Sequence, residues 1–211
     1  MNKNILILGL IASFNAKAES HCDQWCTDGV ICDCEWNAAS NTLTINSGSF
    51  TDYVYDDDDT EVYVPPFANT DYNINVVGNN ISWGENAFSD TSGNINYSGD
   101  GANFDASAFY QASGNITYSG NNAYFYDGFW EASGNITITG NNISFGEGFG
   151  FFSGNAYLLG ENIDLATGGY VAEEGTGNFT VSPAVLRTMF NLYRGFKGQI
   201  YCTEDLKCLK V

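Results

Sequence analysis

Apolar and polar residues alternate along short segments that return every 20 or 21 residues. In Asn94-Ile95-Asn96-Tyr97-Ser98, the two apolar residues fall on one side of an extended chain, a pattern typical of a strand with one buried face. Glycines keep the same period in two columns: Gly93, Gly114, Gly134 and Gly154 in one, and Gly78, Gly99, Gly120, Gly140 and Gly160 in the other. Repetition at this period predicts a mainly β fold, a single parallel β-solenoid whose coils of about 20 residues bury their apolar faces by stacking.

Stacking in register would bring equivalent residues into inward columns. The expected columns are Ile74, Ile95, Ile116, Ile136 and Ala156; Val76, Tyr97, Tyr118, Ile138 and Leu158; Ile81, Ala102, Ala123, Ile143 and Ile163; Trp83, Phe104, Phe125, Phe145 and Leu165; and Phe88, Phe109, Phe129 and Phe149. Aromatic residues at coil spacing favour a packed core over a sugar-binding platform. A column of Asn94, Asn115, Asn135 and Asn155 is interpreted as structural, because stacked asparagines bond to backbone groups and to each other.

The opposite side of the first strand in each repeat carries small polar residues two positions apart. These residues are expected to form a flat outward surface, the one most available to a partner. The candidate binding residues are Asn96, Ser98, Thr117, Ser119, Thr137 and Thr139.

Four segments are expected along the chain. Residues 1–18 have the charge, apolar core and small-x-small ending of a secretory signal peptide, cleaved after Ala18. Residues 19–66 form a cysteine-containing N-terminal cap module, and 67–181 form the solenoid repeats. Residues 182–211 form a C-terminal cap, in which Ser182-Pro183 starts a helix that runs through Phe196. Caps are needed because solenoid ends expose core and strand edges.

All six cysteines lie outside the repeats, and an even number in an exported chain indicates disulfides. Cys202 and Cys208 are the natural local pair. Cys22, Cys26, Cys32 and Cys34 are expected to pair among themselves, with three connectivities open. The alternative hypothesis is a zinc site that includes His21. The oxidising compartment and the irregular spacing of the cysteines disfavour it.

The chain is strongly acidic, and its basic residues are unevenly distributed along the sequence. Its formal net charge is -18, and between Glu19 and Leu186 there is no Lys or Arg. Such a body cannot neutralise phosphates, so nucleic acid is excluded as a partner, and polyanionic glycans are disfavoured. Since no later apolar stretch is long enough, no membrane span is expected either. Proteins, neutral glycans, divalent cations and ordered water remain as partners, and no cofactor is predicted.

Two stretches resemble a known family. Trp83-Gly84-Glu85-Asn86-Ala87-Phe88 is similar to the "IGxxAF" segment of BspA-like, or treponemal-type, leucine-rich repeats. Cys34-Glu35-Trp36 followed by Thr42-Leu43-Thr44-Ile45 resembles the module that precedes such repeats in exported bacterial proteins. The resemblance implies a leucine-rich-repeat-like solenoid in a secreted or surface protein that contacts proteins or a host, without catalytic residues. Since Gly-Asn-Ile and Ser-Gly replace the family's leucine and Ile-Pro positions, a simpler β-solenoid stays an alternative.

Candidate chemistry is sparse. Paired carboxylates in adjacent coils, Asp105 with Asp127 or Glu131 with Glu147, are the basis for an alternative reading as an exported glycan-acting enzyme. The acidic run Asp56 to Asp59 lacks the alternating spacing of an EF-hand, so calcium binding there stays open and disfavoured. No metal ligands are predicted.

The sequence thus predicts a secreted, periplasmic or cell-surface protein that binds a protein or neutral glycan without catalysis, through an extended solenoid face. A third possibility is ice binding, which requires ranks of Thr-x-Thr. Only Thr137-Ile138-Thr139 fits that pattern in full, so ice binding is the least favoured.

Overall fold

A computed structural model describes residues 22, 26–27, 30–50, 53–55, 61–63, 65–150, 152–165, 170–171, 176–182 and 200–202. All regular structure within these ranges is strand. The signal peptide predicted at 1–18, the acidic run at 56–59 and the helix predicted from Pro183 lie outside the described residues.

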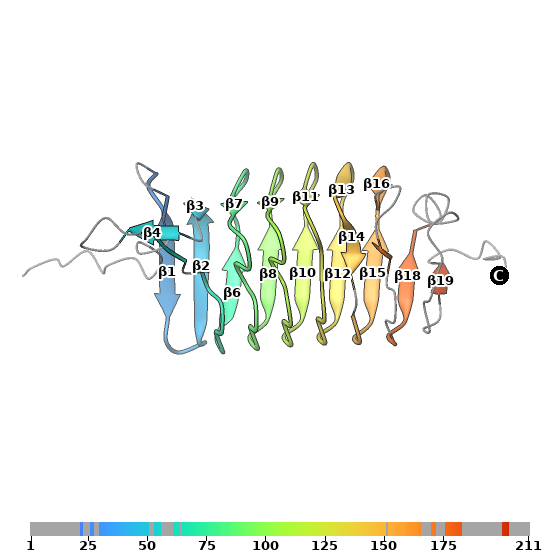
Figure 1. The fold of residues 1–211 in the computed structure, drawn as a ribbon, viewed down its shortest axis with the longest axis horizontal. Helices are drawn as coiled ribbons and strands as arrows, with labels where there is room; N and C mark the ends of the chain where they lie inside the picture. The colour runs from blue at the N-terminus through green and yellow to red at the C-terminus, as the bar shows by residue number, and fades with distance from the viewer. Residues whose placement is uncertain are drawn as a thin grey trace, which may run out of the picture.

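The strands form a parallel β-solenoid, as predicted, with its rungs side by side along the long axis of the molecule (Figure 1). The larger sheet has nine strands, in the order β1 (Asp33–Asn37), β2 (Thr42–Ser47), β6 (Asn73–Val76), β8 (Ile95–Ser98), β10 (Ile116–Ser119), β12 (Ile136–Thr139), β15 (Ala156–Leu159), β18 (Phe179–Val181) and β19 (Ile200–Cys202). All neighbours in it are parallel except β1, which runs antiparallel to β2.

A second sheet of six strands runs beside the first on another face of the coils. Its order is β16 (Ile163–Asp164), β13 (Ile143–Phe145), β11 (Tyr124–Phe125), β9 (Asn103–Phe104), β7 (Ser82–Trp83) and β3 (Ser49–Phe50). Two small sheets complete the strands: β14 (Gly148–Gly150) pairs with β17 (Tyr170–Val171), and β4 (Tyr53–Tyr55) pairs with β5 (Glu61–Tyr63).

The register follows the sequence period. Ile95 pairs with Ile116, and Ile116 pairs with Ile136, so residues 21 and 20 positions apart lie directly opposite each other. The step from Ala156 to Phe179 spans 23 residues, and the last step, from Phe179 to Ile200, spans 21. The predicted repeat is therefore a stack of coils, and each backbone strand bonds to the equivalent strand of the next coil.

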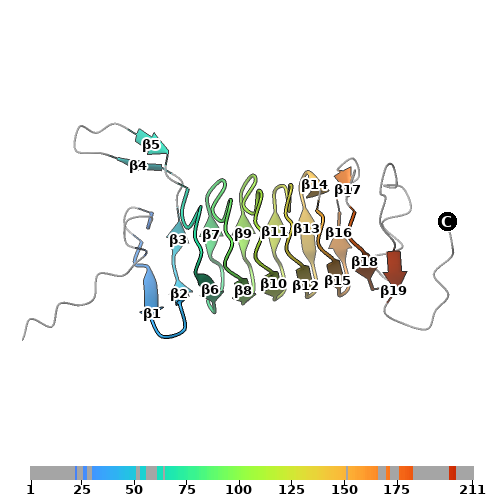
Figure 2. The same ribbon diagram turned by 90° about the horizontal axis from the view of Figure 1, so that it is seen from below.

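The ladder begins earlier than the glycine period indicates. Leu43 on β2 pairs with Ile74 on β6, 31 residues later, so the first rung lies within the range 19–66 that was assigned to the cap. The hairpin of β4 and β5 is inserted in this interval and projects away from the two sheets (Figure 2). The insertion lengthens this coil and hides its period in the sequence.

The inward columns are buried as predicted. Phe104, Phe125 and Phe145 stack with ring centroids 4.6 and 5.0 Å apart, and Phe109 lies 5.1 Å from Phe129 in the neighbouring column. These rings are at most 2% exposed, so the aromatic stripes are core. Offset stacking of this kind contributes about 0.5–1.5 kcal/mol per pair beyond the burial of apolar area.

The glycine columns mark the places where adjacent coils approach most closely. A Cβ on Gly114 would overlap the carbonyl oxygen of Gly93, and one on Gly134 would overlap that of Gly114. Neither Gly114 nor Gly134 has a positive φ. Glycine is therefore required at these positions by the closeness of the backbones.

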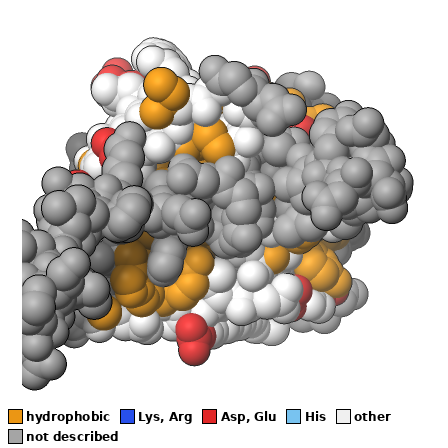
Figure 3. All heavy atoms as spheres, turned by 90° about the vertical axis from the view of Figure 1, so that its left-hand side faces the viewer, with side chains coloured by type: hydrophobic (Ala, Val, Ile, Leu, Met, Phe, Trp, Pro, Cys, Tyr) orange, Lys and Arg blue, Asp and Glu red, His pale blue; other side chains and the backbone are white. Residues whose placement is uncertain are grey.

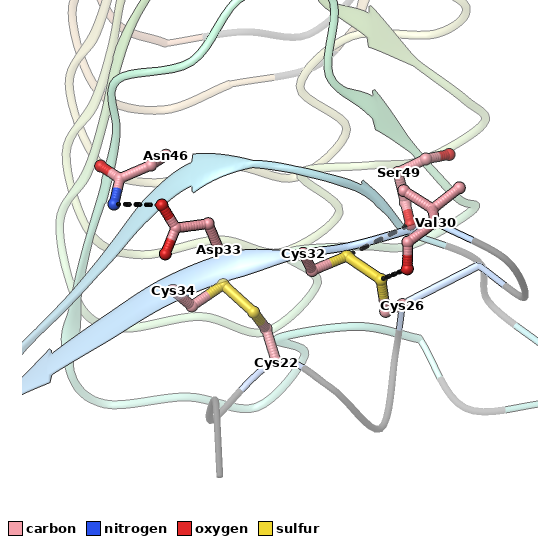
Figure 4. The surroundings of a disulfide bond; sticks show 8 residues. All are labelled: Cys22, Cys26, Val30, Cys32, Asp33, Cys34, Asn46 and Ser49. Carbon is pink, nitrogen blue, oxygen red and sulfur yellow. Dashed lines mark hydrogen bonds between the residues drawn. A yellow bond between two sulfur atoms is a disulfide. The ribbon is translucent and has the colours of Figure 1, made fainter. Parts of the chain in front are cut away.

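Two disulfides fix the N-terminal cap. Cys22 bonds to Cys34 and Cys26 bonds to Cys32, which selects the nested pattern from the three that the sequence left open. Both bridges lie beside β1, where Asn46 also donates to the Asp33 carboxylate at 3.2 Å (Figure 4). Disulfides persist in oxidising compartments, so these bonds indicate an extracellular type of environment. Cys208, the predicted partner of Cys202, lies outside the described residues.

Candidate functional site

The candidate site is the outward side of the nine-stranded sheet between β6 and β18, which we call the outer face. Alternation along each strand points every second side chain to solvent, as in β8, where Ile95 and Tyr97 are buried and Asn96 and Ser98 are exposed. The in-register pairing forms two rows. One row is Asn75, Asn96, Thr117, Thr137, Tyr157 and Thr180, and the other is Ser98, Ser119, Thr139 and Leu159. All six predicted binding residues thus lie on one face in two adjoining rows.

Five hydroxyl groups in the middle of the outer face are not used by the fold. They belong to Ser98, Thr117, Ser119, Thr137 and Thr139, and none of them makes a hydrogen bond to any described residue. Adjacent strands lie about 4.8 Å apart, and alternate residues of a strand lie about 7 Å apart. The five groups therefore form a regular lattice of donors and acceptors that only solvent or a ligand can satisfy.

The asparagine column at the start of these strands, in contrast, makes hydrogen bonds from coil to coil. The Oδ1 atom of Asn115 accepts from the backbone N–H of Asn135 at 3.0 Å, and the Asn115 amide donates to Asn94 Oδ1 at 3.1 Å. The same backbone bond recurs from Asn73 through Asn178, with lengths of 3.0 to 3.2 Å. The structural interpretation of this column is confirmed.

A second side-chain ladder was not predicted. The side chains of Asn79, Asp100, Asn121 and Asn141 each accept from the backbone N–H of the equivalent residue in the next coil, at 2.7 to 3.0 Å. The signal for it is the pair of residues that follows each glycine of the second column, as in Gly120-Asn121-Asn122. The second member of the pair, such as Asn122 or Asn142, has a φ near +57°, which asparagine tolerates better than most residues.

The outer face carries no charge between β6 and β18, although the molecule is strongly acidic. The described carboxylates lie on β1, on β5, in the turns or on the second sheet, and the described residues include no Lys or Arg. Seen from the N-terminal end, the described residues accordingly show acidic side chains and no cationic ones (Figure 3). A ligand of the outer face therefore meets neutral amide and hydroxyl groups within a negative surrounding field.

The carboxylates proposed for catalysis have other partners. Asp127 accepts from the backbone N–H of Ser107 and from its hydroxyl at 3.3 Å, and so connects two coils. Burial raises the pKa of Asp127, the hydrogen bonds from Ser107 lower it, and the nearby Glu147 charge raises it slightly. Asp105 accepts from the backbone N–H of Ala106 at 2.8 Å, a bond within its own turn.

The second proposed pair is similar. Glu131 accepts from the Gln111 amide at 2.6 Å, again across adjacent coils. Within the described part of the chain, the carboxylates of Asp105, Asp127 and Glu131 accept hydrogen bonds from neutral groups. The bonds of Asp127 and Glu131 join adjacent coils, so these two side chains help the coils to stack.

The described residues hold no cluster of three or more His, Cys, Asp or Glu side chains able to bind a metal ion. No helix in the described part is long and apolar enough to span a membrane.

Exposed tyrosines are the feature that sequence reasoning missed. Tyr157 and Tyr201 lie on the sheet of the outer face, 38% and 46% exposed, and Tyr124 and Tyr126 point outward at the second sheet, 37% and 40% exposed. The available signal was the alternation itself, since Tyr157 stands between the inward residues Ala156 and Leu158.

Comparison of the chain with protein-family models, with curated proteins and with solved structures finds no match in any of the three.

Proposed function

We propose that this protein is an exported, non-catalytic binding protein that holds an uncharged ligand on its outer face. The ligand is a neutral glycan or a polar protein surface, and the site of action is outside the cell, in the periplasm or at the cell surface. The disulfides and the expected signal peptide support export. The resemblance to BspA-like repeat proteins points to the same kind of role.

The observation that carries this proposal is the lattice of unused hydroxyl groups. Hydroxyls held on a rigid parallel sheet lose little conformational freedom when they bind, so their hydrogen bonds to a ligand are pre-organised. The described carboxyl groups lie elsewhere, which leaves the flat face suited to a neutral partner.

The two alternatives have less support. An ice-binding face would need Thr-x-Thr in successive rungs, and beside Thr137 and Thr139 the same rows contain Ser119 and Leu159. A two-carboxylate hydrolase needs a free acid and base, whereas Asp127 and Glu131 are engaged in bonds between coils.

A hydroxyl-free variant tests the proposal. Thr117→Val, Thr137→Val and Thr139→Val together remove three lattice hydroxyls and retain the β-branched shape. The matched control is Ser82→Ala with Ser144→Ala, which removes outward hydroxyls from the second sheet. Each protein is tested for retention on cellulose, chitin, mannan and immobilised collagen.

Wild type and control are expected to be retained on at least one of these supports. The triple variant is expected to bind at least tenfold more weakly to that support, with an unchanged far-ultraviolet circular dichroism spectrum. Equal retention of the triple variant and wild type, or no retention of wild type on any support, would contradict the proposal.

A further inference from the structure

Towards the C-terminal end of the sheet, one row of the outer face continues past β18 onto β19 and combines aromatic rings with hydroxyls. Tyr157 pairs across the sheet with Thr180, and Thr180 pairs with Tyr201, so the two tyrosines occupy equivalent positions on either side of a threonine. Two interstrand steps separate them, a distance of about 9–10 Å. On the other side of Tyr157, the directly opposed residue is Thr137, whose hydroxyl belongs to the unused lattice.

This row has the two kinds of contact that a pyranose ring needs. A sugar has an apolar face of C–H groups, which packs against an aromatic ring, and a rim of hydroxyls, which bond to polar side chains. Tyr157 offers the ring, and Thr137 offers a hydroxyl one rung away. The tyrosine spacing also matches the repeat of an extended chain in which every second sugar presents the same face.

Charge selects among sugar classes. The strands that carry the row, β12, β15, β18 and β19, contain no Asp, Glu, Lys or Arg. A uronate or sulfated chain would have no cation to pair with on these strands or elsewhere among the described residues. A neutral chain leaves no buried charge unpaired when it docks.

We propose that Tyr157 and Tyr201 form a stacking platform for an unbranched neutral polysaccharide. The chain runs along the solenoid axis, across the strands. One sugar stacks on Tyr157, the next lies over Thr180, and a third stacks on Tyr201. Thr137 bonds to the sugar that follows on the β12 side. This inference rests on the proposed function and specifies its ligand.

The tyrosines of the second sheet provide a matched control. Tyr126 is 40% exposed, close to the 38% of Tyr157. Tyr124 is the first residue of β11 and Tyr126 comes directly after this strand. The two tyrosines are therefore arranged along the strand direction and not along the solenoid axis. Asp105 and Tyr126 come directly after the paired strands β9 and β11, at equivalent positions.

The test is calorimetric titration of the full mature chain with cellohexaose, chitohexaose and mannohexaose. Wild type is expected to bind at least one hexasaccharide. Tyr157→Ala should weaken that binding about tenfold, which corresponds to about 1.4 kcal/mol. Tyr157→Phe should stay within threefold of wild type because the ring is retained, and Tyr126→Ala should match wild type.

Chain length gives a second readout. The disaccharide of the bound series cannot reach both tyrosines, so the trisaccharide is expected to gain affinity over it in wild type. That gain should disappear in Tyr201→Ala.

Two results would overturn the platform: no hexasaccharide binds, or Tyr126→Ala weakens binding as much as Tyr157→Ala. Its failure can be separated from failure of the proposed function. If the triple threonine variant loses retention on collagen while no hexasaccharide binds wild type, the glycan platform is wrong and binding by the outer face stands. If wild type is retained on no support, both are wrong.

Discussion

Glycine is needed at the coil junctions because two backbones meet there without room for a side chain. The carbonyl oxygen of Gly93 occupies the position where a Cβ of Gly114 would lie, and the same overlap recurs at Gly134 and Gly154. Because the obstacle is backbone, it cannot rotate away as a flexible side chain can. The period that is visible in the sequence is thus a direct record of how closely the coils pack.

Gly114→Ala is therefore expected to lower the free energy of unfolding by about 1–3 kcal/mol, the usual cost of overpacking. The neighbouring exposed Ser113 gives the control, since Ser113→Ala should change stability by no more than about 0.5 kcal/mol. Urea unfolding of both variants measures the difference. Equal midpoints for the two variants would show that the junction has space to spare.

Asp127 shows how burial and hydrogen bonding compete at one carboxyl. Its pKa is raised, first by burial, so the folded protein holds a proton on this group more tightly than the unfolded chain does. Ionisation of Asp127 consequently destabilises the fold, and stability is lost as pH rises from the ordinary value of 3.8 through the higher folded pKa.

Asp127→Asn keeps an oxygen to accept from the Ser107 N–H and removes the charge. The melting temperature of the variant minus that of wild type is expected to increase as pH rises from below 3.8 to neutrality. The difference should be smallest at the acid end. Melting temperatures of both proteins over this range test the sign. A relative gain that shrinks with rising pH would mean that the Ser107 bonds outweigh burial.

Among the elements, the strands and their buried columns could be predicted because each depends on a local alternation that repeats at a fixed spacing. Ile95, Ile116 and Ile136 repeat both the alternation and the spacing, and the structure pairs them directly. The outward residues of the same strands followed from the same alternation.

Three features could not be predicted in this way. The rung at Leu43 is separated from Ile74 by an inserted hairpin, so it lacks the period. The ladder through Asn121 depends on bonds between side chain and backbone of different coils, which spacing alone does not reveal. The alternation puts Tyr157 on the outward side, but its aromatic ring interrupts a row of Asn and Thr and does not repeat at a fixed spacing.

Two disulfides, Cys22–Cys34 and Cys26–Cys32, stabilise the N-terminal cap. Removing Cys22–Cys34, by Cys22→Ala with Cys34→Ala, should destabilise the cap by about 2–4 kcal/mol, because the bridge restricts the unfolded segment. Solenoid coils interact mainly with their neighbours, so the loss is expected to stay local.

Amide hydrogen exchange measures this directly. In the variant, the amides of β1 and β2 should exchange faster than in wild type, while those of β10 and β12 keep their rates. The central strands thus serve as the internal reference. Faster exchange by the same factor in every strand would show that the cap and the stack unfold as a single unit.

At the scale of the whole molecule, one in-register stack accounts for both the core and the candidate site. The columns that bury Phe104, Phe125 and Phe145 are parallel to the rows that align Thr117 and Thr137 on the outer face. A slip of one residue in any coil would reverse the two sides of its strand and break both. The proposed binding therefore depends on register throughout the ladder.

Distances between spin labels on the outer face test this register most directly. One pair of labels is attached through Asn75→Cys and Thr180→Cys. Five interstrand steps separate these two positions, a distance of about 24 Å. Moving the first label to Thr44→Cys adds one step, to about 29 Å, although 31 residues separate positions 44 and 75. An in-register stack predicts two narrow distance distributions that differ by one interstrand spacing. Broad distributions, or a second distance that does not exceed the first by about 5 Å, would contradict it.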